Sequence, residues 1–382
     1  MTNEQIRKRY LLHALLHKFT EQLFFAFGAL LVYAKTGSVL NTLLFVVIGN
    51  ISSLLMKSLG FNPSIKLFKE WGLILSMTLG LVLKVVALVG IFYLAPGYHY
   101  FYLLLFSLHV IENIGNTLYV IGASAVMVEV IGTSVMPGRS SAQIKMLHTV
   151  SGLMAALVGI FMSAHGSFLY LFLIGGIVLL GSTIPLVGIP TPKLPLFSFR
   201  KNLQTISPAM FFANVNPDHQ FKVTGLPLII LAISASLDIS IWVSAGVAVV
   251  SIITAYVAGW VKDHHGTWLI WVALGIGIAS WVAYGFVSSP IAFLLVSILV
   301  GLATEVLGVS REAQMGIDLR GNVLGGTMAF EFARSIGIVI GSSILLIAYL
   351  VAGNLPQLML VMGGLFLIPK ALYAVGSAKN ET

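Results

Sequence analysis

Long apolar stretches make up most of this chain, separated by short turns rich in polar residues, glycine or proline. A helix needs about 20 mostly apolar residues to cross the hydrocarbon core of a membrane. Only the seventh stretch is shorter than this, and it is completed by extending it back to residue 210 through the polar sequence NVNPDHQ. The pattern therefore predicts twelve membrane-spanning helices, and the alternative is eleven helices with a re-entrant seventh segment. The stretches lie near residues 12–34, 39–59, 71–94, 100–127, 141–163, 167–187, 226–235, 240–261, 267–287, 290–312, 325–351 and 356–376.

The composition also indicates a chain that lies mostly in lipid. Of its 382 residues, 58% are hydrophobic and 9% are charged, whereas a soluble domain carries about 25% charged residues. This difference excludes soluble enzymes, kinases and nucleic-acid-binding proteins. The chain has no cysteine, which excludes disulfides and cysteine-ligated metals. Its basic start leads into an apolar run without a clear cleavage site, so we interpret that run as an uncleaved first helix.

The net charge of +8 is distributed unevenly along the chain. If the N-terminus lies inside, the outer connections carry Lys35 alone and the inner segments carry most other basic residues. The positive-inside rule then places both termini in the cytoplasm, with the protein in the inner or plasma membrane. The inner basic residues are Arg7, Lys8, Arg9, Lys57, Lys66, Lys69, Arg139, Lys145, Lys193, Arg200, Lys201, Lys262, Arg311, Arg320, Lys370 and Lys379.

A proline-rich, basic segment at the midpoint divides the chain into two halves. This predicted cytoplasmic linker covers 190–209 and joins a six-helix bundle over 1–189 to a second six-helix bundle over 210–382. The second-to-third and fourth-to-fifth connections are similar in position and residue type between the two halves. Parallel halves of six helices are typical of secondary transporters, whose site lies near the membrane midplane.

The connection between the predicted eighth and ninth helices has the sequence GWVKDHHG, from Gly259 to Gly266. It resembles the loop motif of the major facilitator superfamily, Gly-x-x-x-Asp-(Arg/Lys)-x-Gly, with Asp263 at the acidic position and a histidine in place of the base. The sequence PGR, ending at Arg139, is similar to the inner loop before the fifth helix of that family. Arg320 lies in the corresponding connection of the second half.

The resemblance implies an all-α fold of two six-helix bundles that rock against each other. It also implies that helices one, four, seven and ten line a central cavity, and that the loop residues take part in gating.

Ionisable residues lie in each of these four predicted helices. A charge in the membrane costs about 2.5 kcal/mol or more and usually marks a pathway. We therefore predict a substrate or proton pathway formed by His17, Glu21, His109, Glu112, Asn113, Asn116, Asp218, His219 and Glu305. Two alternatives remain open: the polar stripe around Glu112 forms a hydrogen-bonded seam between helices, or Asp218 and His219 belong to the cytoplasmic loop.

Spacing along single helices predicts two further arrangements. Glu331 and Arg334, at i and i+3, are expected to form a structural ion pair. His13, His17 and Glu21 repeat every four residues along one side of the first helix. They are spread over more than two helical turns, too far for all three to ligate one metal ion. We expect His13 to be solvated near the inner surface, and Glu21 with His17 to belong to an inner proton or cation pathway.

The predicted function is secondary transport of a small solute, coupled to protons, by a monomer without cofactor or enzymatic activity. Glu112 or Glu305 would bind the proton and release it when the cavity changes sides. The chain lacks a phosphate-binding loop, which excludes ATP-driven transport within it. The alternatives are a divalent metal transporter like ferroportin, with histidine and carboxylate ligands, and a non-transporting sensor or scaffold. The few charges in the predicted cavity favour a neutral or cationic amphipathic solute, as in drug efflux, over a highly charged metabolite.

Overall fold

A computed structural model describes residues 3–94, 100–132, 137–164, 168–189, 207–225, 228, 249–250, 252–260, 267–318, 323–353 and 360–376 of the chain. Within these ranges every regular element is a helix. The elements are α1 (Asn3–Thr36), α2 (Val39–Tyr93), α3 (Phe101–Gly132), α4 (Pro137–Ala164), α5 (Phe168–Gly181), η1 (Ile184–Leu186), α7 (Pro208–Asn214), α8 (Asp218–Gln220), η2 (Phe221–Gly225), α11 (Trp268–Tyr284), α12 (Pro290–Asp318), α13 (Val323–Ala352), α14 (Met362–Leu365) and α15 (Ile368–Gly376).

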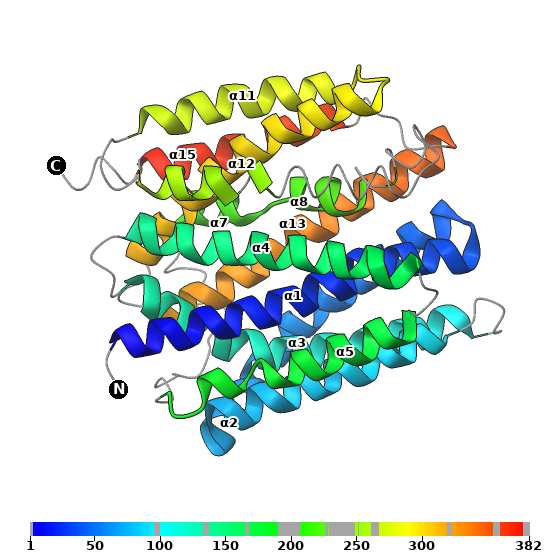
Figure 1. Cartoon of the computed structure of the whole chain (residues 1–382), viewed down its shortest axis with the longest axis vertical. Coiled ribbons are helices and arrows are strands. Elements are labelled where there is room, and N and C mark those ends of the chain that lie inside the picture. Colours follow the sequence, from blue (N-terminus) through cyan, green and yellow to red (C-terminus); the bar gives the residue numbers. More distant parts are fainter. Residues whose placement is uncertain are drawn as a thin grey trace.

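The long helices run side by side along one direction of the molecule (Figure 1). α1 begins and α15 ends at the same end of this bundle, on the left of Figure 1. The bend in α2 and the start of α4 lie at that end too. The part of α2 that leads into the bend contains Lys66 and Lys69, and the first turn of α4 contains Arg139. We call this end of the bundle the basic end.

Five of the described helical segments are long and apolar enough to cross a membrane, judged by length and composition. They are Val39–Leu59, Asn62–Tyr93, Phe101–Ala123, Pro290–Asp318 and Ala329–Ala352. Three shorter apolar helices accompany them. Large apolar side chains such as Ile177, Ile291 and Val351 are exposed. Water would penalise so much exposed apolar surface, which indicates a multi-pass membrane protein.

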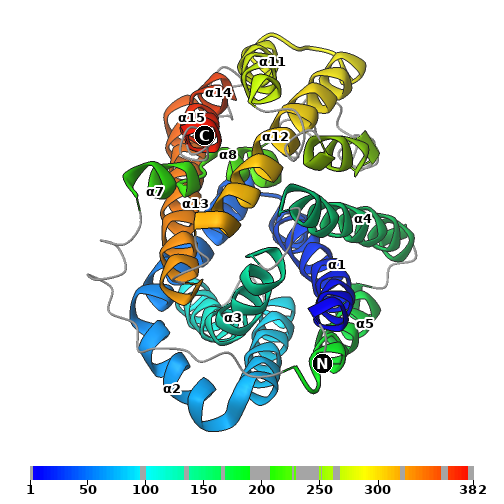
Figure 2. The same cartoon turned by 90° about the vertical axis from the view of Figure 1, so that its left-hand side faces the viewer.

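Most of the described helices follow apolar stretches of the sequence, with one fusion. The predicted span 356–376 is described from residue 360 and contains two short helices, α14 and α15. α2 covers two predicted spans, 39–59 and 71–94, as one element with Pro63 inside it. Its backbone leaves helical geometry at Gly72, where φ is 80°, a conformation that a residue without a Cβ adopts at little cost. Beyond this bend the chain runs back along the bundle (Figure 2).

The polar break predicted in the seventh span is present. α7 ends at Asn214, the chain is non-helical over 215–217, and the single turn α8 leads into the π-helix η2. Two glycines of α13, Gly337 and Gly341, let this broken segment approach closely. A Cβ on Gly341 would lie 2.5 Å from the carbonyl oxygen of Pro217. The continuation over 229–248 lies outside the described residues.

Each half has its own apolar core, and the two cores meet where α12 and α13 pack on α2, α3 and α4. One core is built from α1, α2, α3, α4 and α5, and the other mainly from α11, α12, α13 and α15. Leu43 of α2 and Ala142 of α4 belong to the second core. Accordingly α13 packs on α2 and α3, and α12 packs on α4 and α3, between the two groups of helices in Figure 2.

Candidate functional site

Charged and histidine side chains from both halves gather where the halves meet. Each of them is partly exposed, although each belongs to a helix of the bundle. Lys18 and Glu305 lie near the midpoints of α1 and α12. We call this set the interface cluster: Lys18, Glu21, Lys145, His148, His219, Lys222, Glu305 and Arg334.

Electrostatic interactions across the interface show that the cluster shares one space. The charges of Lys18 in the first half and Arg334 in the second half both act on His148 of α4. The same two charges act on His219 of α8, together with that of Lys222. Side chains of the two halves in this cluster therefore lie within range of one another's charge.

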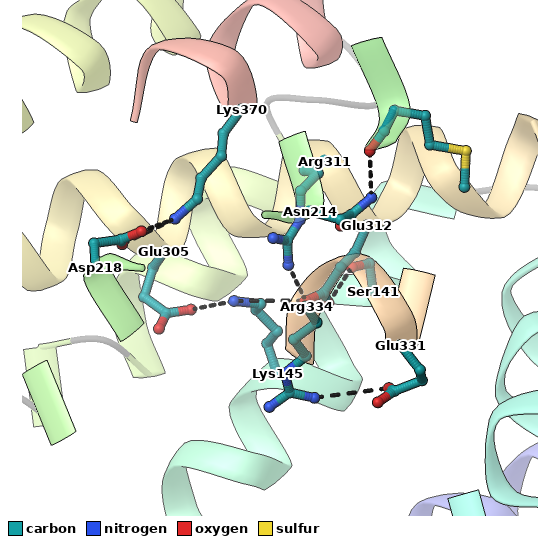
Figure 3. Close-up of polar contacts among 11 residues, drawn as sticks. Ser141, Lys145, Asn214, Asp218, Glu305, Arg311, Glu312, Glu331, Arg334 and Lys370 are labelled. Carbon is teal, nitrogen blue, oxygen red and sulfur yellow. Dashed lines mark hydrogen bonds and ion pairs between the residues drawn. The ribbon is translucent and has the colours of Figure 1, made fainter. Parts of the chain in front are cut away.

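Lys145 of α4 reaches across to α12. Its Nζ lies 3.5 Å from Glu305 Oε2 and 3.8 Å from Glu312 Oε1 (Figure 3). Gly308 lies between the two glutamates along the helix and makes room for the lysine, because a Cβ there would lie 3.1 Å from Lys145 Cε. Ser141 donates a hydrogen bond of 3.4 Å to Glu312. Lys145 is thus held between two carboxylates at long distance.

A shorter and more deeply buried ion pair joins α2 to α13. Lys57 Nζ donates to Glu331 Oε2 at 2.7 Å, and the two side chains are 7% and 8% exposed. The predicted contact between Glu331 and Arg334 is also present, at 3.8 Å. The spacing of the sequence therefore identified one partner of Glu331, and the closer partner comes from the other half.

Asp218, predicted to line the pathway, is buried in an ion pair within the second half. Lys370 of α15 donates to both of its oxygens, at 2.8 and 2.9 Å (Figure 3). Lys222 lies 3.6 Å away. His219, the next residue, belongs to the interface cluster. The broken seventh helix thus directs one of these neighbours into its own bundle and the other towards the interface.

The polar stripe of α3 packs against α2. His109 Nδ1 lies 2.9 Å from Glu112 Oε2, and the imidazole ring lies over Gly49 of α2. Asn113 donates to Ser52 at 2.7 Å. These contacts are those of a hydrogen-bonded helix–helix seam, the alternative left open for this stripe. Asn116, one turn further along, is partly exposed.

His13, His17 and Glu21, which form one row along α1, have different surroundings. His13 is fully buried, with Nδ1 2.6 Å from the Ser182 carbonyl and Nε2 2.8 Å from the Tyr119 hydroxyl. The expectation of a solvated His13 is therefore wrong, because α1 turns this face into its own bundle. His17 stacks on the Tyr119 ring at 4.0 Å between centroids and is also buried. Glu21 pairs with Lys18 and belongs to the interface cluster.

The loop-motif residues lie mostly outside the described part of the chain. Gly259 is buried at the end of a helical segment, 252–260. Asp263, Gly266 and Arg320 are not among the described residues. Arg139 is exposed in the first turn of α4. The gating role that the resemblance implies for these residues stays a prediction.

Sequence reasoning did not place five members of the interface cluster on the pathway, although it assigned Arg334 to an ion pair with Glu331. The five are Lys18, Lys145, His148, Lys222 and Arg334. Three of them, Lys18, Lys145 and His148, follow a simple rule. Lys18 and Glu21, and also Lys145 and His148, lie at i and i+3 and so share a helix face. Searching every span for such charged pairs would have found them. No group of three or more histidine or carboxylate side chains arranged to hold a metal ion occurs among the described residues.

No protein-family model and no curated protein matches this sequence. Solved structures match it over nearly the whole chain. The proton:xylose symporter XylE of the major facilitator superfamily is 16% identical, with a TM-score of 0.70, and the match covers 97% of this chain and 94% of that chain. The human organic anion transporter MFSD10 (TETRAN) is 13% identical, with a TM-score of 0.70, covering 98% of this chain and 100% of that chain.

A bacterial homologue of the iron transporter ferroportin, in an outward-facing state, is 15% identical, with a TM-score of 0.68, covering 98% of this chain and 99% of that chain. At these identities the similarity establishes the fold. The chain therefore has the fold of the major facilitator superfamily, as the loop motif predicted.

Proposed function

We propose that this protein is a secondary transporter that moves a small solute across the membrane by alternating access. The observation that carries the proposal is the interface cluster, in which partly exposed charged side chains from both halves meet near the middle of the helices. Such charges are costly in a membrane unless they serve a pathway. Rocking the two halves about this cluster would expose it to one side of the membrane at a time.

The basic end is assigned to the cytoplasm by the positive-inside rule, since Lys66, Lys69 and Arg139 lie there. Both termini then lie in the cytoplasm. Lys57 and Glu331 join the halves on this side of the interface cluster. Opening the site towards the cytoplasm therefore requires this ion pair to break.

Glu305 is the carboxylate that we assign to proton coupling. The charged groups that face it are Lys145 of α4, Lys222 of η2 and Glu312 of its own helix. Protonation would cancel the attraction between Glu305 and Lys145 and so weaken the link between α4 and α12. Glu112 is less suitable, because its ion-pair partner, His109, lies on its own helix.

The substrate does not follow from the fold. The similar structures are described as a proton:xylose symporter, an organic anion transporter and a homologue of an iron transporter. Proteins with this fold are thus described as transporters of chemically different substrates, so the substrate class has to be inferred from the residues of the site.

The test is uptake into proteoliposomes under an imposed pH gradient, with a panel of neutral, anionic and cationic solutes and divalent metals. We expect the wild-type protein to concentrate at least one solute. The variant Glu305→Gln should equilibrate that solute without concentrating it, and Glu112→Gln, the matched control, should still concentrate it. A wild-type protein that moves no solute contradicts transport, and a Glu305→Gln variant that still concentrates the solute contradicts the proton role.

A further inference from the structure

The interface cluster carries more positive than negative side chains. Its cations are Lys18, Lys145, Lys222 and Arg334, and its carboxylates are Glu21 and Glu305. The neighbouring Glu312, which also contacts Lys145, pairs with Arg311 at 3.4 Å, and this pair leaves the excess unchanged. Two histidines, His148 and His219, lie among them. Uncompensated charge of one sign at a partly exposed site attracts a ligand of the opposite sign.

The excess can be traced to two residues by pairing each carboxylate with its nearest lysine. Within the cluster, Lys18 pairs with Glu21 and Lys145 with Glu305. Two cations remain, Lys222 and Arg334. The carboxylate nearest to each of these two cations lies at least 3.6 Å away, and a lysine that is closer to it already forms an ion pair with it.

Lys222 Nζ lies 3.6 Å from the Asp218 carboxylate, whereas Lys370 Nζ lies closer to the same carboxylate, at 2.8 Å. The guanidinium group of Arg334 lies 3.8 Å from the Glu331 carboxylate, whereas Lys57 Nζ lies closer to that carboxylate, at 2.7 Å. Both carboxylates are therefore already neutralised by buried lysines. The positive charges of Lys222 and Arg334, the more distant cations, are therefore left largely uncompensated.

Exposure separates the two kinds of cation. The side chains of Lys370 and Lys57 are 6% and 7% exposed, as expected of sealed ion pairs. Those of Lys222 and Arg334 are 29% and 36% exposed. The two open cations lie on elements that pack together, because α13, which carries Arg334, packs on α8 and on η2, which carries Lys222. The charges of both act on His219 of α8.

We infer that the interface cluster binds a small organic anion, whose carboxylate or phosphate group is held by Arg334 and Lys222. This inference rests on the proposed function, since the same cluster is the transport site. A guanidinium group presents a planar fork of N–H donors that matches a carboxylate or phosphate, and an ammonium group adds a second positive charge. His219 lies where it can contribute a further N–H donor. The arrangement favours an anion over the neutral or cationic solute that the sequence alone favoured.

The experiment measures the melting temperature of the purified full-length protein with matched compounds that differ in charge. One set is benzoate, phenyl phosphate, benzamide and benzylamine, and the second is glucuronate, glucose 6-phosphate, glucose and glucosamine. We expect an anionic member to raise the melting temperature and its neutral and cationic counterparts to leave it unchanged. Comparing the carboxylate with the phosphate in each set shows which of the two anionic groups the site prefers.

Variants then connect the binding to the two cations. Arg334→Gln and Lys222→Gln should each weaken the affinity for the stabilising anion by about tenfold or more, since each removes a charge-assisted hydrogen bond. Arg334→Lys should retain part of the affinity, because it keeps the charge and loses the fork. The control Lys8→Gln should bind like the wild type, because Lys8 lies on the surface of α1 with its side chain 74% exposed.

The inference is overturned if the cationic members stabilise the protein more than the anions, if no anion stabilises it, or if the two glutamine variants bind the anion like the wild type. Counterflow of the same compound in proteoliposomes separates this result from the proposed function. Anion binding without counterflow keeps the anion site and removes transport, whereas counterflow of a cation keeps transport and removes the anion site.

Discussion

The ion pair between Lys57 and Glu331 should control how often the two halves separate at the basic end. The pair is short, at 2.7 Å, and both side chains are nearly inaccessible to solvent. Changing Lys57 to Met leaves the Glu331 carboxylate buried without its nearest partner. The penalty falls on the closed state, because opening would hydrate the carboxylate.

Removing one partner of a buried ion pair costs roughly 3–5 kcal/mol. Arg334 already lies 3.8 Å from Glu331 and compensates part of the charge, so the lower end of this range applies. About 3 kcal/mol changes the ratio of two conformations roughly 100-fold. Replacing both Lys57 and Glu331 by Met removes both charges, and the double variant should return towards the wild-type ratio.

The absence of cysteine makes a direct assay possible. Ser141 is fully buried at the interface of the halves, with its hydroxyl 3.4 Å from Glu312, so Ser141→Cys reports separation at the basic end. Its labelling by a membrane-impermeant maleimide should accelerate by up to about 100-fold in the Lys57→Met background. Ser76→Cys, buried inside the first half, reports unfolding, and the exposed Ser58→Cys reports reagent access.

Three results would contradict this reasoning. Equal labelling of Ser141→Cys with and without Lys57→Met would mean that the pair does not hold the halves together. Accelerated labelling of Ser76→Cys would mean that the first half unfolds and no gate opens. A double variant that labels as fast as Lys57→Met would mean that the unpaired Glu331 charge is not the cause.

The remaining predictions concern binding and stability. Glu305→Gln should strengthen anion binding, because it removes the carboxylate that lies 3.5 Å from Lys145 and leaves that cation available to the anion; unchanged or weaker binding by calorimetric titration would refute this. Asp218→Asn should lower the melting temperature, because it leaves Lys370 buried without its partner and reduces the free energy of unfolding by roughly 3–5 kcal/mol. Adding Lys370→Met should restore much of this stability. A double variant that is no more stable than Asp218→Asn would exclude the unpaired charge as the cause. Gly337→Leu should prevent stable folding, seen as aggregation in size-exclusion chromatography, because its side chain would meet the backbone of Asn216; a monodisperse, wild-type-like variant would show that α13 need not approach so closely.

The sequence predicts most of the described helices because a membrane leaves the backbone few options. Every N–H and C=O group in lipid must be satisfied within its own segment, so a long apolar run becomes a helix. The break in the seventh span was also predictable, since Pro217 lacks the N–H that a continuous helix needs and lies among polar residues. A reversal between the spans 39–59 and 71–94 was expected, but the continuous helical element with a single non-helical residue, Gly72, was not.

The candidate site was only partly predictable, because hydropathy does not determine how each helix is rotated. The stripe containing His109 and Glu112 looked suitable for a cavity, but it faces α2. Glu331 and Arg334 were paired correctly from their spacing. The closer partner, Lys57, lies 274 positions away in the sequence, where no local pattern could identify it.

Transport of an organic anion by the interface cluster is tested most directly by uptake. The anion that most raises the melting temperature would be radiolabelled and supplied to proteoliposomes under an inward pH gradient, with wild-type protein or Arg334→Gln reconstituted at equal density. The account predicts accumulation above equilibrium with the wild type and none with the variant. Equal accumulation by both proteins, or none with the wild type, would contradict it.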